Sequence, residues 1–494
     1  MALPIRESGI LSVADGIARV LGLLFLARFV LEMGLGESAA FRIVLPMIGV
    51  AASFGSIGVP QALTRLFASG SGSWRTAVWA TLLAMLVSVA GLATLSTLAS
   101  LRGGPAHEIA KLCITATPLL LLTCWTGSLR GILFGLGSTY APALAQVLEI
   151  GTRLWVLTTI WPLVKSDLPA SGSQVGLYIL TTGELATAVF LSLVLGSVLR
   201  KRRLTPPLTT HTLPTVLRMA CAPAGQALLA SLGYALELPL AEAWLSQTLD
   251  HEAARNLIAN YSAIALPLLC APMVFTDGLA TALLPSASAQ QSRTALQLRR
   301  VIAAVALLAL PVTAALLVLA PQLTSWFGSG AAAGLLLALA PLTLPFYLQA
   351  PLSSLLQASG YSRALLIAGL CGDAVRIGTL YLAIHTLQFT RFALPLACAA
   401  AVCVQTAILL RLALNLTREA TIPWRTLLHA GSSTLPLMAI LISGLHAPAD
   451  LSLQAHPLAW SLLAATVTLL HLRLAGVVPP LPHLLHRLTE KEHL

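Results

Sequence analysis

Long hydrophobic segments recur along the whole chain, separated by short polar stretches. Each has roughly 20 predominantly apolar residues, the length that crosses a bilayer as an α-helix. We count about fourteen of them, near residues 9–31, 39–60, 75–99, 110–136, 140–163, 174–198, 214–246, 257–285, 297–320, 332–358, 362–386, 390–414, 427–446 and 455–475. Only helices or closed barrels satisfy all backbone polar groups in lipid, and runs this long indicate helices. The pattern predicts an all-α polytopic membrane protein.

Composition agrees with this class. The 494 residues are 57% hydrophobic and only 10% charged, whereas soluble domains average about 25% charged residues. The first segment is interrupted by charges and is not followed by a cleavage site and a soluble domain. We therefore interpret it as a retained helix and not as a signal peptide.

The net charge of +11 comes from an uneven distribution of Lys and Arg. Basic residues are concentrated after every second segment, as in Arg65, Arg75, Arg130, the "RKRR" stretch at 200–203, Arg293, Arg299, Arg300, Arg363, Arg411, Arg418 and Arg425. The positive-inside rule then predicts that both termini are cytoplasmic in a multi-pass protein of the cell membrane. The same distribution argues against a nucleic-acid partner.

The chain also contains a weak internal repeat. At a shift of 223 residues, "FGLGSTYAPALAQVLEIGTR" (134–153) lies over "QASGYSRALLIAGLCGDAVR" (357–376), so that Gly137 pairs with Gly360 and Arg153 with Arg376. This shift is close to six segments, and an even number gives two halves of the same orientation. We expect a six-helix lobe at 1–203, a second at 204–418, and two additional helices with a cytoplasmic tail at 419–494.

Several charges lie inside the hydrophobic segments, beginning with "DGIARVLGLLFLAR" at 15–28. A charge at the bilayer centre costs at least ~3 kcal/mol, so such residues usually face a protein interior or a water-filled cavity. Three arginines at middle depth each follow an acid by three or four residues: Arg19 with Asp15, Arg153 with Glu149, and Arg376 with Asp373. Two interpretations are open, structural ion pairs or a cationic substrate cavity in which the carboxylates orient the arginines.

Four further acids, Glu184, Glu237, Glu242 and Asp277, lie within the segments, and any of them could carry a coupling proton or sodium ion. No motif for catalysis, for a cofactor or for a bound metal is present, because the chain has no phosphate-binding loop, HExxH or GxSxG. We therefore expect a transporter and not an enzyme.

Several stretches carry a resemblance to a known family: "GIARVLGLLFLARFV" (16–30), "FRIVLPMIGVAASFGSIGVPQALTRLFA" (41–68), "RGILFGLGSTYAPALAQVLEIGTRL" (130–154), "YSAIALPLLCAPMVFTDGLATALLPSAS" (261–288) and "PFYLQAPLSSLLQASGYSRALLIAGLCGDAVRI" (345–377). They resemble the stage V sporulation protein B and polysaccharide-export flippases. These are a branch of the superfamily that includes multidrug and toxin extrusion (MATE) transporters and lipid II flippases. Lipid II flippases of the Gram-negative type usually carry an Arg-Asp pair after the first-helix motif, where this chain has Leu24 and Phe25.

The resemblance implies two six-helix lobes plus two helices that work by alternating access. It also implies a substrate linked to undecaprenyl pyrophosphate, such as a peptidoglycan precursor, moved among membrane lipids for cell-wall synthesis or sporulation. Proteins of cell-envelope synthesis are candidate partners. Glu237 matches the family's acid in the seventh span, whereas Asp277 lies where the family is usually apolar or small. We take these two as the candidate ion-coupling acids.

Three functions compete: a flippase for a lipid-linked saccharide, a cation-coupled multidrug exporter of the MATE type, and a scaffold for envelope synthesis. The exporter would need an aromatic cavity, but only 6% of residues are aromatic. Guanidinium groups bind phosphate oxygens through a bidentate fork. The flippase, with Arg19, Arg153 and Arg376 as substrate ligands, is therefore the preferred hypothesis.

The predicted topology is testable by cysteine labelling in intact cells. In a cysteine-free background, Lys201→Cys should resist a membrane-impermeant thiol reagent, because it lies in the basic, cytoplasmic "RKRR" stretch. Asp167→Cys, in the opposite set of loops, should be labelled. The reverse pattern would invert the orientation.

Overall fold

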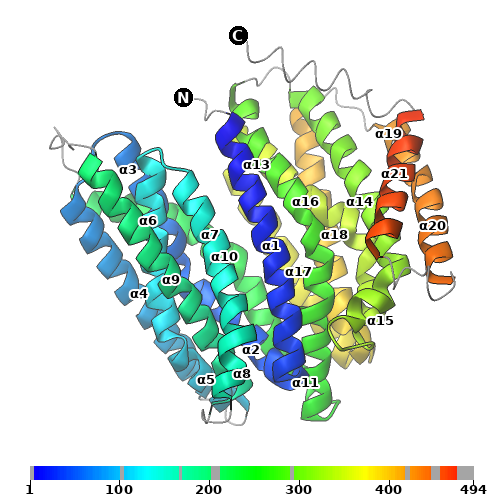
Figure 1. Ribbon diagram of the computed structural model, residues 1–494, viewed down its shortest axis with the longest axis horizontal. Coiled ribbons are helices and arrows are strands. Elements are labelled where there is room, and N and C mark those ends of the chain that lie inside the picture. Colours follow the sequence, from blue (N-terminus) through cyan, green and yellow to red (C-terminus); the bar gives the residue numbers. More distant parts are fainter. Residues whose placement is uncertain are drawn as a thin grey trace. The chain divides into compact units, whose positions relative to one another are not determined.

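The computed structural model describes residues 5–100, 105–165, 170–201, 212–289, 294–417, 423–446 and 457–474. Both chain ends and the "RKRR" stretch beyond Lys201 lie outside the described residues. The described chain is helical, without a strand (Figure 1). It divides into two compact units, residues 1–274 with 366–401 and residues 275–365 with 402–494.

The helices follow one another with short connections. The first stretch of the chain forms α1 (Ile5–Met33), α2 (Leu35–Ser53), the π-helix η1 (Phe54–Gly58), α3 (Val59–Ala68), α4 (Trp74–Ser100), α5 (Pro105–Thr115), α6 (Thr117–Gly135), α7 (Tyr140–Trp155), the π-helix η2 (Val156–Ile160), α8 (Trp161–Val164) and α9 (Gly172–Lys201). The middle forms α10 (Leu213–Leu245), α11 (His251–Ala259), the π-helix η3 (Asn260–Ala265), α12 (Leu266–Cys270), the 3₁₀ turn η4 (Ala271–Met273) and α13 (Val274–Ala289). The rest forms α14 (Thr294–Ser325), α15 (Ala332–Leu339), the 3₁₀ turn η6 (Ala340–Leu342), α16 (Thr343–Ala358), α17 (Ser362–His385), the 3₁₀ turn η7 (Thr390–Phe392), α18 (Ala393–Thr417), α19 (Trp424–Ser432), α20 (Thr434–His446) and α21 (Pro457–Leu474).

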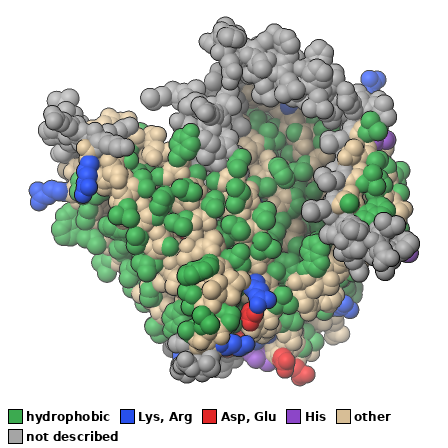
Figure 2. Space-filling model, viewed as in Figure 1, with side chains coloured by type: hydrophobic (Ala, Val, Ile, Leu, Met, Phe, Trp, Pro, Cys, Tyr) green, Lys and Arg blue, Asp and Glu red, His purple; other side chains and the backbone are tan. Residues whose placement is uncertain are grey.

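The predicted all-α membrane class is confirmed. Within the described residues, 12 helical stretches are long and apolar enough to cross a membrane. Hydrophobic side chains are spread over the described surface visible in Figure 2, where charged side chains are few. Helices α1 and α21 coincide with the first and last predicted segments but are not among the 12. The count of fourteen therefore stays a prediction.

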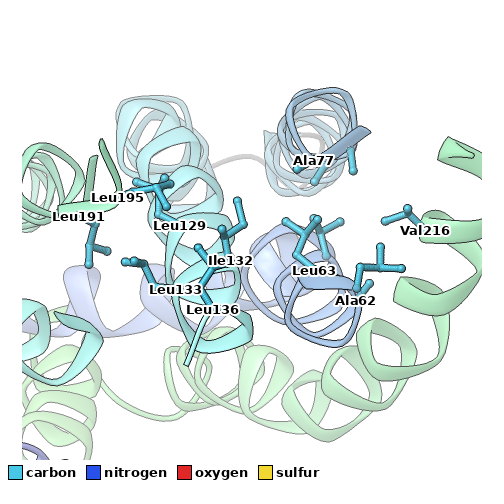
Figure 3. Close-up of a cluster of buried hydrophobic side chains, with 14 of the residues drawn as sticks. Ala62, Leu63, Ala77, Leu129, Ile132, Leu133, Leu136, Leu191, Leu195 and Val216 are labelled. Carbon is cyan, nitrogen blue, oxygen red and sulfur yellow. The ribbon is translucent and has the colours of Figure 1, made fainter. Parts of the chain in front are cut away.

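Small and branched apolar residues form the core of the first unit. Leu63 of α3, Ala77 of α4, Leu133 of α6 and Leu191 of α9 are nearly inaccessible to solvent and belong to one cluster (Figure 3). A Cβ at Gly131 would lie 2.5 Å from the carbonyl oxygen of Pro60. Glycine at this position thus lets α6 approach the backbone of α3.

In the second unit, the helices that follow the predicted repeat pack onto α14. Ala314 of α14, Leu437 and Leu441 of α20 and Ala464 of α21 form one buried cluster. Since lipid is as apolar as these side chains, close packing and not hydrophobic burial stabilises such contacts.

The two glycines paired by the sequence repeat form the same turn. Gly137 has φ 77° and Gly360 has φ 86°, a conformation that only glycine adopts at low cost. After each glycine a backbone N–H returns to the end of the preceding helix, from Ser138 to the carbonyl of Leu133 and from Tyr361 to that of Leu356. This is the Schellman ending of a helix. Both α7 and α17 therefore begin directly after an equivalent turn.

The motif "GSIGVPQA" (55–62) combines a break in the helix with close packing. The π-helix η1 ends at Gly58, and Pro60 lies in the first turn of α3. A Cβ at Gly58 would lie 2.7 Å from the carbonyl oxygen of Ala220 and 2.8 Å from Cβ of Ala224, both on α10. Any larger residue at 58 would have to move α10.

Substitution of Gly58 should therefore destabilise the protein. We expect Gly58→Ala to lower the free energy of unfolding by about 1–3 kcal/mol, because it overpacks a contact with backbone atoms. The matched control is Gly49→Ala in α2, where no atom would lie within 4 Å of the new Cβ. The measurement is the thermal midpoint of each purified variant in detergent. Equal midpoints for the two variants would contradict the close approach.

Candidate functional site

The three arginines predicted to bind substrate lie in the first unit but differ in exposure. The exposed fraction of the side chain is 33% for Arg19 on α1, 17% for Arg153 on α7 and 4% for Arg376 on α17. Each forms an ion pair with a carboxylate. The cost of placing these charges among hydrophobic helices is thereby reduced.

Around Arg153, two arginines share the carboxylate of Glu149. Nη2 of Arg130 donates a hydrogen bond to Oε2 of Glu149 at 2.6 Å, and Nη2 of Arg153 lies 2.5 Å from Oε1 of the same carboxylate. Arg153 is also 3.7 Å from Glu184, which accepts a hydrogen bond from the hydroxyl of Thr126 at 2.9 Å. We call these five residues the first charge cluster. They join α6, α7 and α9.

The local sequence explains how Arg153 is accommodated. Glu149 precedes it by one helical turn, so the two side chains lie on the same face of α7. On the facing helix α9, a Cβ at Gly183 would lie 2.6 Å from Cγ of Arg153. Glycine at 183 therefore leaves the space that the arginine side chain occupies.

Arg19 is connected to the same region through α7. Its Nε donates to Asp15 at 3.1 Å, and Nε2 of Gln146 donates to the other oxygen of Asp15 at 3.0 Å. Gln146 precedes Glu149 by three residues on α7, so the two lie on one helix face. The structure thus brings Asp15 and Arg19 to the helix that carries Glu149 and Arg153.

Arg376 lies in a separate and almost sealed cluster. Its Nη1 donates to Glu237 of α10 at 3.0 Å, and its guanidinium carbon lies 4.2 Å from the ring centroid of Tyr234. The hydroxyl of Tyr261 donates to the second oxygen of Glu237 at 3.5 Å. Glu237 and Arg376 expose 1% and 3% of their surface. We call these four residues the second charge cluster.

The remaining predicted acids have other positions. Asp373, three residues before Arg376, lies against Gly233 of α10, where any Cβ would overlap its carboxylate. The ion pair of Arg376 is formed with Glu237 instead. Asp277 is half-buried in the first turn of α13, in the second unit.

Three buried guanidinium groups retain a donor without a partner. Nε of Arg130, Arg153 and Arg376 is buried and makes no hydrogen bond within the described part of the chain. A buried unsatisfied donor costs about 1–3 kcal/mol. These groups could therefore donate a further hydrogen bond to an anion without losing an existing contact at Nε.

A third ion-paired arginine site was missed in the sequence. Nε of Arg255 on α11 donates to Glu242 of α10 at 2.9 Å, and its Nη2 donates to Glu108 of α5 at 2.5 Å. These partners are 13 and 147 residues away in the chain. No local spacing could have indicated the contact with Glu108.

Sequence analysis also missed the contact of Arg130 with Glu149. Arg130 was interpreted only as a topological charge, and the distant Glu149 gave no signal for it.

The described residues give no support for a metal site. No group of three or more His, Cys, Asp or Glu side chains there could hold a metal ion.

The first unit also contains an apolar groove. This groove of about 470 Å³ borders α2, η1, α4 and α10, with Phe54, Val87, Leu95 and Leu228 in its walls. No charged side chain lines this groove, so it suits an apolar ligand and not a charged headgroup.

Comparison with known proteins identifies the fold. The chain has the fold of the MOP-superfamily transporters and is a multi-pass membrane protein. No protein-family model matches it. The predicted resemblance is confirmed, because the chain is 25% identical over 404 residues to stage V sporulation protein B of Bacillus subtilis (strain 168), with 75% of this chain and 76% of that protein covered.

Two solved structures illustrate the fold. The lipid II flippase MurJ in an inward closed conformation superposes with a TM-score of 0.67 at 14% identity and covers 93% of this chain and 97% of its own. An inward-facing MATE-family multidrug resistance transporter gives a TM-score of 0.64 at 17% identity and covers 82% of this chain and 100% of its own.

The buried pair of Arg376 and Glu237 makes a specific stability prediction. Arg376→Met or Glu237→Leu alone should lower the free energy of unfolding by about 3–5 kcal/mol, because each leaves an unpaired buried charge. The double variant should lose much less free energy of unfolding than the sum of the losses of the two single variants. Arg28→Met is the control: it breaks an exposed pair with Glu32, which is worth only about 0–1 kcal/mol. Thermal midpoints in detergent give the comparison, and additive losses would contradict a direct coupling.

Proposed function

We propose that the protein is a flippase that moves a saccharide linked to a polyprenyl pyrophosphate across the membrane by alternating access. The observation that carries the proposal is the set of arginines within the helices of a MOP-type fold. The diphosphate of such a lipid is multiply anionic, and guanidinium groups recognise phosphate oxygens through charge-assisted hydrogen bonds. A peptidoglycan precursor on undecaprenyl pyrophosphate is the specific substrate we propose.

One structure of this fold supports the substrate class by its name, which is lipid II flippase. The sequence relative is named as a stage V sporulation protein, which connects the chain with sporulation but specifies no substrate. The arginines within the helices favour an anionic ligand in this chain.

The two predicted lobes, 1–203 and 204–418, would rock against each other, with residues 419–494 as an addition and both termini in the cytoplasm. The lipid tail would stay in the bilayer while the charged headgroup crosses between the lobes. Arg19, Arg153 and Arg376 are the proposed substrate ligands. Asp15 and Glu149 are the proposed orienting carboxylates of the first two, and Asp373, near the Glu237 that pairs with Arg376, is the third. Glu237 and Asp277 are the proposed ion-coupling acids. Such a cycle needs no catalytic group, so the protein would act as a transporter and not as an enzyme.

Arg19 gives the first functional test, because it is the most exposed of the three arginines. Arg19→Lys retains the charge but loses the fork, so it should weaken binding of a polyprenyl-pyrophosphate saccharide. Arg19→Ala should weaken it further, by roughly 10- to 100-fold, as expected for the loss of about 1.5–3 kcal/mol from a charged hydrogen bond.

The measurement is binding of a fluorescent lipid II analogue to purified protein, followed by its translocation in proteoliposomes. A cationic dye is the negative control, since a MATE-type exporter would bind it. Wild-type protein that binds the dye but not the lipid would overturn the proposed function. Arg28→Ala provides the variant control, because Arg28 forms an exposed ion pair near the end of α1.

A further inference from the structure

The ion-paired arginine of α11 joins two parts of the chain that the proposed cycle has to separate. Arg255 belongs to the proposed lobe 204–418, and Glu108 belongs to the lobe 1–203. Nη2 of Arg255 donates to Oε2 of Glu108 at 2.5 Å, so a charge-assisted hydrogen bond crosses from one lobe to the other within the first unit. The other arginine ion pairs described above each stay within one lobe, namely those of Arg19, Arg28, Arg130, Arg153 and Arg376.

The contact lies at the helix ends opposite to the basic stretches. Arg255 is in the second turn of α11, which follows the end of α10, and α10 begins after the "RKRR" stretch. Glu108 is in the first turn of α5, which follows the end of α4, and α4 begins beside Arg75. Figure 1 shows α5 and α11 at the same end of the first unit and α3 at the other end. In the topology predicted by the positive-inside rule, the end with α5 and α11 is the outer face.

Arg255 binds two carboxylates that differ in burial. Its Nε donates to Glu242 on α10 at 2.9 Å, within its own lobe. The exposed fraction of the side chain is 4% for Glu242 but 38% for Glu108. If Glu108 moved away, water could hydrate its carboxylate, and Arg255 would keep its buried partner. The contact between the lobes can therefore break without leaving a buried charge unpaired.

The pair of Arg376 with Glu237 has the opposite property. Both of its side chains are almost fully buried, so separating them would leave two buried charges without partners. Ion pairs with an exposed member contribute little free energy and can form and break readily. The contact of Arg255 with Glu108 thus suits a reversible step, whereas that of Arg376 with Glu237 suits a permanent one.

We propose that Glu108 and Arg255 form a latch that closes the outer face between the two lobes and opens in each transport cycle. Glu108 is the partner that leaves, and Glu242 holds Arg255 in place throughout. The inference rests on the proposed function, because only a chain that works by alternating access between these lobes has to release the contact. It adds to that function the residues that control the outer opening.

Removing the charge of Glu108 should favour the open outer face. In a cysteine-free background, spin labels at Lys111→Cys on α5 and Glu252→Cys on α11, both exposed, report the distance across the latch by pulsed electron paramagnetic resonance. Glu108→Gln should raise the population ratio of the longer to the shorter distance by roughly two- to fivefold, as expected for the loss of an exposed ion pair. The thermal midpoint should stay close to that of wild type, because Arg255 keeps Glu242.

Glu32→Gln is the matched control, because Glu32 forms an ion pair with Arg28 at 2.7 Å near the end of α1, within one lobe. It should leave the distances between the labels unchanged. An unchanged distance ratio in Glu108→Gln, or the same increase in Glu32→Gln, would overturn the latch. A midpoint of Glu108→Gln lowered as much as that of Arg376→Met would also overturn it, since the contact would then be structural.

A second experiment fixes the contact covalently. Glu108→Cys with Arg255→Cys, joined by a bifunctional methanethiosulfonate, should lose translocation of the fluorescent lipid II analogue and regain it when the disulfides are reduced. The control is His251→Cys with Arg255→Cys, which are one turn apart on α11 and should lose no activity on cross-linking. Equal translocation by the Glu108→Cys/Arg255→Cys protein before and after cross-linking would overturn the latch.

The latch and the proposed function fail separately. Translocation of the lipid II analogue, together with label distances that do not depend on Glu108, would overturn the latch and leave the proposed function in place. Wild-type protein that binds no lipid II analogue, but whose label distances depend on Glu108, would overturn the proposed substrate and support the latch.

Discussion

The cost of a charge inside hydrophobic helices is the constraint on which this structure depends. It explains why Glu149 is shared by Arg130 and Arg153, and why Arg376 reaches across to α10 for Glu237. It also explains two glycines that have no role in turns. Gly183 and Gly233 leave space for Arg153 and Asp373, respectively. The packing of these helices is therefore adapted to a few charged side chains as much as to the apolar majority.

The repeat shows how one local structure can serve two electrostatic arrangements. Gly137 and Gly360 form equivalent turns, and each is followed 16 residues later by an arginine. Arg153 finds its carboxylate one turn away on the same helix, whereas Arg376 finds it on α10. The first arginine keeps 17% of its side chain exposed and the second only 4%. A ligand could thus approach Arg153 directly, but would reach Arg376 only after Glu237 or its helix had moved.

The predictable part of the molecule is the part encoded over short distances. The helices were predicted from the length of the apolar segments, because a helix needs a minimum number of apolar residues to cross a bilayer. The i,i+4 spacing predicted the ion pairs of Arg19 with Asp15 and of Arg153 with Glu149. The partners of Arg376, Arg130 and Arg255 are 139, 19 and up to 147 residues away, and helix periodicity contains no information about them. The π-helices at η1, η2 and η3 were likewise not predictable from the apolar pattern.

A buried donor without a partner is more informative about function than one that is paired. A paired arginine is explained equally well by stability and by function, because removing it disturbs both. A buried donor without a partner contributes nothing to the stability of the resting protein, because its desolvation is not offset by a hydrogen bond. Within the described residues, Nε of Arg130, Arg153 and Arg376 is such a donor: in each, the unused donor and not the ion pair is the feature that points to an anionic ligand.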